Sequence, residues 1–402
     1  MEKIRVENLT KIFGGHVKQV RGLIEQGKSK KEILKATGAT VGVNNASFAV
    51  EDGEIFVIMG LSGSGKSTLI RMINRLIEPT SGNVFLDGQD IAKLGKEDLR
   101  RVRREKLSMV FQNFALFPNR TVLANAAYGL EIRNVKQAER EEKALAALKR
   151  VGLEGYDQQY PSQLSGGMQQ RVGLARALAS DADVLLMDEA FSALDPLNRK
   201  DMQDELLELQ EELHKTIVFI SHDLNEALRI GNHIMIMRDG DIVQCGTPED
   251  ILTEPANEYV ERFIEDVDRT KVITAGTVMI RPYTVNIDSD GPRVALRRMR
   301  ENEVSTLMVV DRQRQLVGTI DARDTIALIE RDKNRSVQRL DSIVQRDVST
   351  TDADTPLNEL LDQFAQTSMP IAVLDEKKRL RGIVIRGAVL AAMAGTEVVD
   401  HD

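Results

Sequence analysis

Hydrophobic and polar positions follow two different patterns along the chain, and the change falls near residue 270. Up to about residue 265, short apolar runs typical of β-strands alternate with stretches of helical periodicity, and one of these runs, EIFVIM, is typical of a buried parallel strand. The apolar runs are VNNASFAV, EIFVIM, VFLDG, KLSMVF, VLLMDE, TIVFISHD and HIMIMRDG, and helical spacing is clear over 140–151 and 204–213. This alternation predicts one large α/β unit over residues 1–265.

A polar stretch interrupts the beginning of this unit. HVKQVRGLIEQGKSKKEILKATG follows Phe13-Gly14-Gly15, and its apolar spacing predicts one or two short amphipathic helices near residues 15–40. Two interpretations stay open at this point: a surface for a partner, or an insertion that simply packs on the unit.

The remainder of the chain contains an internal repeat. TLMVVDRQRQLVGTID begins at Thr306 and PIAVLDEKKRLRGIVI begins at Pro370, so the copies lie 64 residues apart (370 − 306) without a gap. The same offset pairs Asp288 with Asp352, Pro292 with Pro356, Asp311 with Asp375 and Gly318 with Gly382. Each copy reads as helix, strand, charged turn, strand, helix, and two such copies can bury each other's apolar faces. The repeats, at about 272–332 and 336–396, resemble a tandem CBS-domain pair over 266–396. A short acidic tail at 397–402 contains Glu397, Asp400 and Asp402.

Composition narrows the class of protein. The 402 residues suggest two or three domains, and 42% hydrophobic with 29% charged residues is ordinary for a soluble globular protein. No run of 18 apolar residues predicts a membrane span, and the start, MEKIRVENLTKIF, lacks a signal-peptide core. The single cysteine, Cys245, cannot form an internal disulfide, which fits a reducing cytoplasm. A net charge of −8 and the absence of Trp give no support for a nucleic-acid partner.

The stretch GLSGSGKST carries the first candidate chemistry. It stands between the strand-like EIFVIM and LIRMINRLI, in which Leu69, Ile70, Ile73, Leu76 and Ile77 fall on one helical face. Its spacing matches the phosphate-binding pattern G-x-x-x-x-G-K-[ST]. An ordinary Gly/Ser turn is the alternative, but the flanking strand and helix favour a phosphate-binding loop.

Such a loop binds phosphate because glycines let several backbone N–H groups face one anion, and the helix N-terminus adds positive potential. Lys66 can reach the β- and γ-phosphates of ATP, and Ser67 can hold Mg²⁺ through its hydroxyl. The loop residues expected to contact ATP are Gly60, Ser62, Gly63, Ser64, Gly65, Lys66, Ser67 and Thr68.

Two carboxylates end the apolar run VLLMDE. Asp188, at the strand end, suits a Mg²⁺ or metal-water contact near Ser67. Glu189 points elsewhere and is suited to polarise an attacking water. An acid pair met alone is often only solvated, but the phosphate-binding loop favours these roles.

A second glycine turn, QLSGGMQQR, leads into the helical run MQQRVGLARALA and has no lysine after its glycines. It predicts an anion-binding helix N-terminus at Ser165, Gly166 and Gly167, and the alternative is a plain helix cap by Ser165. With GLSGSGKST and VLLMDE, this LSGGMQQ motif resembles the ATP-binding-cassette (ABC) ATPases, although Met168 departs from the commonest form. The resemblance implies an α/β P-loop NTPase fold of the ABC-cassette type, followed by the α/β CBS pair.

The resemblance also implies roles for other residues. Gln112 in MVFQNFALFP is similar to the Q-loop glutamine that touches Mg²⁺ and the attacking water, and Asp195 in SALD is similar to the D-loop. His222 in FISHD matches the switch histidine that contacts the γ-phosphate, and Phe13 stands where the family stacks an aromatic ring on adenine. The implied catalytic residues are Lys66, Gln112, Glu189 and His222, the implied Mg²⁺ ligands are Ser67, Gln112 and Asp188, and ATP lies in a sandwich dimer. Each ATP is then held between the Gly60–Thr68 loop of one copy and the Ser165–Gly167 turn of a second copy.

Over essentially its whole length, the chain is similar to the glycine betaine/proline betaine importer ATPases. The segments that carry this resemblance are IFVIMGLSGSGKST, NRLIEPTSG, MVFQNFALFP, YPSQLSGGMQQRVGLARALA, LLMDEAFSALDPLNR and FISHDLNEALRIG, with the insertion and the repeat. It implies a peripheral subunit on the cytoplasmic face of the cell membrane that powers import through a separate permease, with a substrate-binding protein or domain. The segment after Gln112 is where the family receives the permease's coupling helix, and Phe114, Leu116 and Phe117 are consistent with docking. Carnitine or choline cargo stays open, because none of these residues contacts the cargo.

Two basic groups in the repeat suggest regulation: Arg297, Arg298 and Arg300 form one, and Lys377, Lys378, Arg379 and Arg381 form the other. Such groups can bind an anionic membrane surface at low salt and detach when salt screens the attraction. The alternative is a solvated basic turn. In the family, CBS pairs of this kind are linked to ionic-strength sensing, and some bind cyclic-di-AMP or adenine nucleotides.

Two other classes of protein fit parts of the sequence. A soluble ABC ATPase that works on DNA or the ribosome usually carries two cassettes or a long coiled coil, whereas this chain has one cassette and no long heptad run. A nucleotide sensor with an inactive cassette is disfavoured because Gln112, Glu189 and His222 are all present. Membrane co-fractionation tests the first class, and ATP turnover tests the second.

Overall fold

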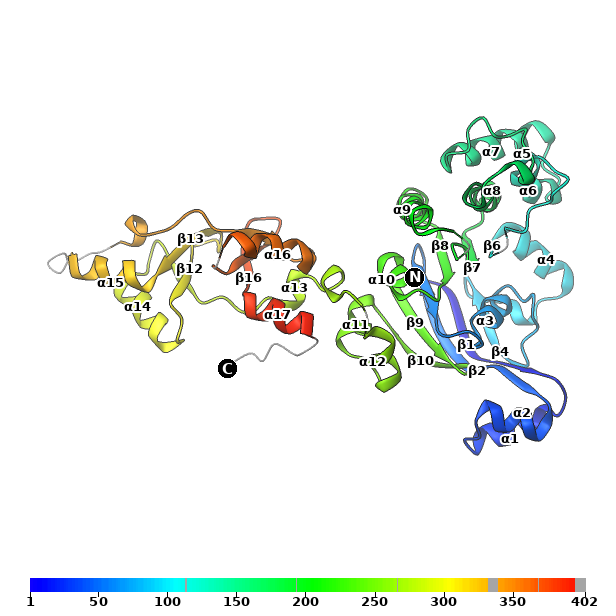
Figure 1. Ribbon diagram of the computed structural model, residues 1–402, viewed down its shortest axis with the longest axis horizontal. Helices are drawn as coiled ribbons and strands as arrows, with labels where there is room; N and C mark the ends of the chain where they lie inside the picture. Colours follow the sequence, from blue (N-terminus) through cyan, green and yellow to red (C-terminus); the bar gives the residue numbers. More distant parts are fainter. Residues whose placement is uncertain (113, 193, 266, 332–338, 368, 395–402) are drawn as a thin grey trace. The chain divides into compact units, whose positions relative to one another are not determined.

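The computed structural model describes residues 1–112, 114–192, 194–265, 267–331, 339–367 and 369–394. The chain forms two compact units that divide between Val267 and Asp268, close to the change in hydrophobic pattern (Figure 1). The acidic tail at 397–402, and the expected repeat ends near 332, 336 and 396, lie outside the described residues. No helix among the described residues is long and apolar enough to cross a membrane.

A six-stranded sheet forms the centre of the first unit, in the order β10-β9-β3-β8-β7-β6. Neighbouring strands run parallel from β9 to β6, and β10 is antiparallel to β9. The strands are β3 (Ile55–Met59), β6 (Leu107–Phe111), β7 (Val184–Asp188), β8 (Thr216–Ile220), β9 (His233–Arg238) and β10 (Asp241–Gly246). Every residue of β3, β7 and β8 is buried, which explains their unbroken apolar sequences.

An antiparallel sheet packs on this centre, in the order β2-β1-β4-β5. Its strands are β1 (Glu2–Phe13), β2 (Thr40–Glu51), β4 (Ser81–Leu86) and β5 (Gln89–Asp90). Ile4, Val6 and Leu9 of β1 share one core cluster with residues of the central sheet. The rings of Phe48 and Phe56 stack across the two sheets, with centroids 5.2 Å apart. This shared core fixes the end of β1, where Phe13 lies, relative to the loop after β3.

Helices connect and cover the two sheets. Those beside the sheets are α3 (Lys66–Ile73), α4 (Lys96–Glu105), α9 (Pro196–Leu213), α10 (Leu224–Ile230), α11 (Pro248–Thr253) and α12 (Glu258–Ile264), with the short helix η1 (Ile91–Lys93). A separate helical layer lies beside the β6 edge of the sheet (Figure 1). It consists of α5 (Val122–Ala126), α6 (Tyr128–Ile132), α7 (Gln137–Arg150), η2 (Pro161–Gln163) and α8 (Gly166–Ala179). Fully buried Asn125 donates to the carbonyl oxygens of Phe117, Arg120 and Thr121, and so fixes the chain that enters this layer.

The insertion near residues 15–40 forms two helices, α1 (Val17–Glu25) and α2 (Lys30–Thr37). Val20 and Ile33 are buried and share a small core with Ile12, Ala39 and Val41. Ser29 begins α2 with a capping box, in which the Glu32 carboxylate accepts from the Ser29 N–H at 2.9 Å. Packing on the first unit therefore accounts for the buried apolar positions of the insertion, but not for Leu34, which is 48% exposed, or for the charged side chains.

The helix after the phosphate-binding loop is shorter than its sequence pattern predicts. Apolar spacing places Leu76 and Ile77 on the same helical face as Ile73, but α3 ends at Ile73. Asn74 ends the helix, and Arg75 has a left-handed backbone with φ of 55°. The face prediction is wrong for Leu76, which is 55% exposed.

The second unit consists of two repeats with the same strand topology. The first contains β11 (Thr284–Asn286), α14 (Pro292–Glu301), β12 (Thr306–Val310), β13 (Leu316–Asp321) and α15 (Ala322–Arg331). The second contains β14 (Thr350–Asp352), α16 (Leu357–Gln366), β15 (Ile371–Leu374), β16 (Leu380–Val384) and α17 (Arg386–Ala394). In each, the first strand pairs parallel with the second, which pairs antiparallel with the third.

Each repeat is completed by the segment that opens the other repeat. The segment with η3 (Arg269–Lys271) and α13 (Ala275–Val278) precedes the first repeat, yet its Ile273 and Val278 lie in the core of the second. The segment with η4 (Leu340–Ser342) precedes the second repeat, yet its Leu340 and Val344 lie in or against the core of the first. This exchange of segments makes the two repeats one structural module.

Substitution of Gly318 by Ala tests the exchange. A Cβ at Gly318 lies 2.3 Å from the carbonyl oxygen of Gln345, in the exchanged segment, and that backbone atom cannot move away cheaply. We expect Gly318→Ala to lower the free energy of unfolding of this unit by about 2 kcal/mol, measured by calorimetry. Gly387→Ala is the control, because a Cβ at Gly387 meets nothing within 4 Å. Equal effects of the two substitutions would contradict the close approach.

Candidate nucleotide site

The phosphate-binding loop packs so closely against β9 of the central sheet and β2 of the antiparallel sheet that two of its positions admit only glycine. Gly60 has φ of 141°, and a Cβ there lies 2.2 Å from the carbonyl oxygen of Met237. Gly65 has φ of 110°, and a Cβ there lies 2.3 Å from the carbonyl oxygen of Gly42. The loop thus presents a narrow backbone cradle at the N-terminus of α3, which is the arrangement that binds a phosphate.

Lys66 is the first residue of α3, and its side chain folds back over the loop. It is 5% exposed, and its Nζ donates to the carbonyl oxygens of Gly60 at 2.7 Å and Leu61 at 3.3 Å. Burial lowers the pKa of the Lys66 ammonium below its ordinary value, while the carboxylates of Glu189 and Asp188 oppose this. A buried ammonium whose nearest hydrogen-bond acceptors are neutral carbonyls is well suited to bind phosphate oxygens.

A cavity of about 350 Å³ lies over this loop. It is lined by Phe13, Lys30, Thr40, Gly42, Ser62, Gly63, Gly65, Lys66, Ser67, Thr68 and Glu189. Phe13 is 40% exposed, and its ring packs directly against Gly42. A Cβ added at Gly42 would come within 2.7 Å of this ring. An exposed ring at one end and a phosphate cradle at the other fit a purine nucleotide. Sequence reasoning missed Lys30, Thr40 and Gly42, which lie far from any nucleotide motif in the sequence.

Ser64 adds a further sign that the loop is built for an anion. Its Oγ is buried and has no hydrogen-bond partner among the described residues. Buried hydroxyls normally have partners, so this donor is available to a bound group. The residues present therefore fit a nucleoside triphosphate.

Two of the three metal-binding candidates, Ser67 at the start of α3 and Asp188 at the end of β7, meet beside the loop. Ser67 Oγ donates to Asp188 Oδ1 at 2.9 Å, and an Arg71 guanidinium nitrogen lies 3.1 Å from Asp188 Oδ2. A hydroxyl and a carboxylate are hard oxygen ligands of the kind that Mg²⁺ prefers, together with phosphate oxygens. Among the described residues, no group of three His, Cys, Asp or Glu side chains could hold a metal ion without such help. These side chains fit a Mg²⁺ ion that is bound together with a phosphate.

Three predicted catalytic residues converge beside this pair. Gln112 Nε2 donates to Glu189 Oε2 at 3.0 Å, and His222 Nδ1 lies 3.9 Å from the same oxygen. They follow β6, β7 and β8, which are neighbours in the sheet, so their carboxyl ends bring these side chains together. Gln112 also donates to Ser192 Oγ at 3.3 Å. Its hydrogen bonds run to the Glu189 side of the site rather than to Ser67 and Asp188.

The backbone at Glu189 is strained in a way that serves this arrangement. Its φ is 49°, a conformation that costs a non-glycine residue on the order of 1 kcal/mol. Ser192 holds the turn, because its N–H and its Oγ both donate to the Glu189 carbonyl oxygen, at 3.2 Å and 2.9 Å. The left-handed turn directs Glu189 toward Gln112 while Asp188 remains with Ser67.

The turn that carries His222 is also tied down. Ser221 Oγ donates to the carboxylate of Glu226, which also accepts from Gln203 Nε2 at 3.0 Å. Burial raises the pKa of Glu226 above its ordinary value. His222 itself is exposed, so it is free to meet a ligand that enters the cavity.

The second glycine turn does not line the cavity of its own chain. Ser165 caps α8 by accepting from the Met168 N–H at 3.3 Å, and Gly166 and Gly167 form the first turn of the helix. Asp195 caps α9 in the same way, by accepting from the Asn198 N–H at 3.2 Å. Among the described residues that line the cavity, none comes from 165–167 or 195. Four of the predicted ATP contacts thus lie away from this cavity. Of the other nine, seven line it, and Gly60 and Ser64 belong to the phosphate-binding loop without lining it.

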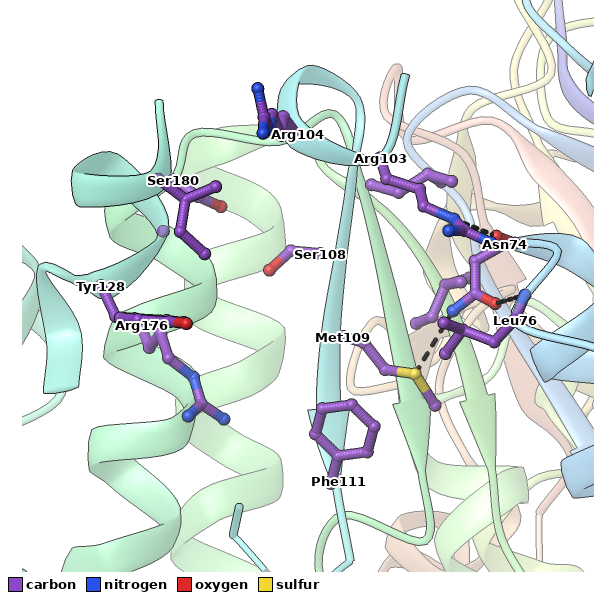
Figure 2. Close-up of a pocket in the computed structure, with 14 residues that line it drawn as sticks. Asn74, Leu76, Arg103, Arg104, Ser108, Met109, Phe111, Tyr128, Arg176 and Ser180 are labelled. Carbon is purple, nitrogen blue, oxygen red and sulfur yellow. Dashed lines mark hydrogen bonds between the residues drawn. The ribbon is translucent and has the colours of Figure 1, made fainter. Parts of the chain in front are cut away.

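A second cavity, of about 440 Å³, lies between the central sheet and the helical layer (Figure 2). The central sheet contributes Met109 and Phe111, the helical layer contributes Tyr128 and Ile132, and Leu76 follows α3. Arg176 of α8 points along this cavity in Figure 2, and its guanidinium donates to the carbonyl oxygens of Phe114 and Ala115. Sequence reasoning missed these lining residues, whose apolar character reads as ordinary core.

The three apolar residues expected to dock a partner lie beside this cavity and do not line it. Phe114, Leu116 and Phe117 are each half-buried. The Phe117 ring packs against that of Tyr128, with centroids 4.5 Å apart. Phe114 lies close to the second glycine turn, because a Cβ added at Gly166 would be 3.8 Å from its ring.

The two basic groups of the second unit are partly neutralised within the fold. Arg298 pairs with Asp290 at 3.1 Å, and Arg379 pairs with Asp375 at 2.7 Å. Arg297 lies 3.6 Å from Glu301. The exposed residues of the second group, Lys377, Lys378, Arg379 and Arg381, lie at or next to the turn between β15 and β16.

Family models match both units of the chain. The model described as "ABC transporter" matches residues 43–192, and the model described as "CBS domain" matches 275–331 and 340–395. These matches confirm the prediction of an ABC cassette followed by a CBS pair.

Several curated proteins match nearly the whole chain. It is 63% identical to the glycine betaine/carnitine transport ATP-binding protein GbuA of Listeria monocytogenes, over 99% of each chain. It is 59% identical to the glycine betaine transport ATP-binding protein OpuAA of Bacillus subtilis, over 98% of this chain and 93% of the relative. It is 50% identical to the glycine betaine/proline betaine transport system ATP-binding protein ProV of Escherichia coli, over 97% of each chain.

Among solved structures, the chain is similar to the ATP-binding cassette MJ0796, in a dimeric post-hydrolysis state bound to ADP and Pi. The identity is 32% and the TM-score 0.52, over 61% of this chain and 98% of the other.

Proposed function

This chain belongs to the family of ATP-binding subunits of glycine betaine-type ABC transporters, and from this premise we propose that it hydrolyses ATP to drive import of glycine betaine or a related quaternary amine. The observation that carries the catalytic part is the convergence of Gln112, Glu189 and His222 beside a cavity lined by Lys66 and Ser67. The names of the relatives support the cargo.

In the proposed reaction, Phe13 stacks on the adenine and the Gly60–Thr68 loop holds the phosphates. Lys66 neutralises charge that develops on the γ-phosphoryl group and its bridging oxygen. Ser67 and Asp188 hold Mg²⁺, which supplies further neutralisation of phosphate charge when it is bound. Glu189 accepts a proton from the attacking water, Gln112 fixes the orientation of the Glu189 carboxylate, and His222 contacts the γ-phosphate.

A second copy of the chain completes each site. The Ser165–Gly167 turn lies outside the cavity of its own chain, and so does Asp195. The related cassette MJ0796 is described as a dimer bound to ADP and Pi. We therefore assign the turn to the ATP bound by the partner copy, where its helix N-terminus faces the γ-phosphate. Closure of two copies around two ATP molecules then transmits the work of hydrolysis.

We assign the second cavity to the permease. Leu76, Tyr128 and Ile132 offer apolar contacts there, and Phe111, the residue before Gln112, also lines the cavity. Arg176 lines it as well and donates to the carbonyl oxygen of Phe114. A helix seated in this cavity therefore contacts elements that are continuous with the catalytic residue Gln112. We propose that the chain acts in this way on the cytoplasmic face of the cell membrane, together with the permease and a substrate-binding protein or domain.

Charge placed in this cavity is expected to break docking. Both Leu76→Asp and Ile132→Asp put an unpaired carboxylate against the incoming apolar helix, which we expect to weaken co-purification with the permease at least about 10-fold. ATP binding by the isolated subunit should remain. Leu145→Asp is the matched control, because Leu145 is 44% exposed on α7 and does not line the cavity. If Leu145→Asp were as damaging as the other two, the loss would report misfolding and not docking.

The function is tested by ATP turnover of the subunit with its co-purified permease in anionic lipid, at low and high salt. Glycine betaine, carnitine and choline are compared, because one relative carries carnitine in its name. Turnover stimulated by glycine betaine supports the proposed cargo. Stimulation by carnitine or choline alone would replace it, and turnover that ignores all three would remove the transport assignment.

We further propose that the CBS pair gates this activity, either by ionic strength or by a bound cyclic-di-AMP or adenine nucleotide. The candidate electrostatic contact is the exposed turn at Lys377 and Lys378, which suits an anionic membrane surface. The group at Arg297, Arg298 and Arg300 is the second candidate.

Charge reversal tests the ionic mechanism. Lys377→Glu with Lys378→Glu is expected to lower the salt concentration at which turnover is half-activated, because screening then has less attraction to overcome. The measurement is turnover against potassium chloride in vesicles with and without anionic lipid. The paired control is Lys143→Glu with Lys149→Glu on α7 of the first unit, and an unchanged threshold in the CBS variant would exclude this turn as the contact.

A further inference from the structure

We infer that Lys30, in the inserted helix pair, is a further nucleotide-binding residue whose ammonium group holds a phosphate oxygen of ATP. The inference rests on the proposed ATPase function and adds a contact from outside the family motifs. Lys30 Nζ donates to the carbonyl oxygen of Gly63, within the phosphate-binding loop, at 3.1 Å. Lys30 also lines the same cavity as Lys66, Ser67 and Thr68.

The fold holds the backbone of Lys30 in place, unlike that of a lysine on a mobile surface loop. Lys30 is the first residue of α2, directly after the Ser29 capping box. Ile33, one turn later, is 2% exposed and packs in the small core with Ile12 and Val41. Ile12 lies in β1 and Val41 in β2, and the same two strands carry Phe13 and Gly42 of the nucleotide cavity. The helix pair therefore shares a rigid base with the site, and less entropy is lost when the Lys30 side chain is ordered.

The ammonium group of Lys30 can still donate to a phosphate oxygen. An ammonium has three donors, and Gly63 takes one of them as a neutral acceptor. Two acids are near Lys30. Burial raises the pKa of Asp241, the Lys30 ammonium opposes this rise, and Asn44 donates to Asp241 Oδ1 at 2.8 Å. Glu189 lines the same cavity as Lys30. A phosphate oxygen forms a stronger, charge-assisted hydrogen bond than the Gly63 carbonyl does. Lys30 can thus retain Gly63 and donate to a bound phosphate at the rim of the loop.

The test measures, by calorimetry, the equilibrium binding of ATP, ADP and adenosine to the full chain in the absence of Mg²⁺. We expect Lys30→Ala to weaken ATP and ADP about 10-fold, the size of one charge-assisted hydrogen bond, and to leave adenosine unchanged. Lys30→Arg should recover most of the affinity, because it keeps the charge. The dependence of ATP affinity on salt should also become shallower in Lys30→Ala, because one cation no longer faces the phosphates.

Lys31→Ala and Lys35→Ala are the matched controls, because both residues are exposed on the same helix. ATP affinities in Lys30→Ala equal to those of the two controls would overturn the inference. Equal loss for ATP and adenosine would also overturn it, since it would show general damage to the cavity. A wild-type chain that binds no ATP would instead remove the proposed function on which the inference rests.

A second readout follows the insertion itself. If Lys30 contacts the phosphates, ATP should slow amide hydrogen exchange in α1 and α2 of the wild type, but not in Lys30→Ala. Protection of these helices in both proteins would assign the effect to the loop alone and contradict a role for Lys30.

Discussion

Replacement of Glu189 by Gln is expected to reduce ATP hydrolysis by about 100-fold or more while ATP binding persists. The loss follows from removal of a general base, a class of contribution that amounts to about 10²- to 10⁴-fold. Gln has the size of Glu, and its amide oxygen can still accept from Gln112 Nε2, which donates to Glu189 at 3.0 Å. Turnover is measured as phosphate release, and binding by calorimetry in the same preparation.

The same variant should also trap the closed pair of copies. Because hydrolysis reopens the proposed dimer, Glu189→Gln with ATP is expected to elute as a dimer, and with ADP as a monomer. Glu211→Gln, at an exposed position of α9, is the control and should behave as the wild type. Undiminished hydrolysis in Glu189→Gln would remove the proposed base.

Replacement of Asp188 by Asn is expected to weaken Mg²⁺ binding and, with it, ATP turnover. Asp188 is 5% exposed and accepts from Ser67 at 2.9 Å, so Asn keeps the shape and that hydrogen bond while it deletes the charge. We expect Mg²⁺ affinity in the presence of ATP to fall at least about 100-fold, and turnover with it. Titration of Mn²⁺ into the ATP complex, followed by electron paramagnetic resonance, measures the metal directly.

Loss of the Arg71 ion pair could imitate this result, and Arg71→Met separates the two. That variant removes the partner 3.1 Å from Asp188 and leaves the carboxylate in place. It should retain metal binding, because Arg71 is itself 46% exposed in its side chain and its pair is partly solvated. If Arg71→Met loses Mn²⁺ as Asp188→Asn does, the carboxylate acts by positioning the helix and not as a ligand.

Much of the site could be predicted from the sequence because its residues stand at the ends of buried strands. Asp188 and Glu189 end an apolar run, and His222 follows another, so local pattern gives both the strand and the exposed chemistry. The order of the parallel strands then makes these ends neighbours. The strained φ at Glu189 has no local signal, since Glu is not a residue that favours it.

Residues that reach the site through tertiary packing could not be predicted. Lys30 lies 33 positions before Gly63 and belongs to an insertion whose pattern shows only amphipathic helices. Leu76 reads as a buried helix position, because apolar spacing does not reveal that the helix ends at Ile73. The cavity beside Met109 and Tyr128 depends on the placement of the helical layer beside the sheet, for which no short-range rule exists.

The exchange of opening segments in the second unit has a consequence for biosynthesis. Leu340 lies in the core of the first repeat and Val344 packs against it, although both follow all of its described strands and helices. A ribosome that has released residues up to 331 has therefore exposed a repeat with an open core. Translation must continue past residue 344, and the exit tunnel must release that segment, before the first repeat can close. During that interval the apolar side chains around Val285 and Leu307 are without their full cover, so chaperone capture of the nascent chain should peak there.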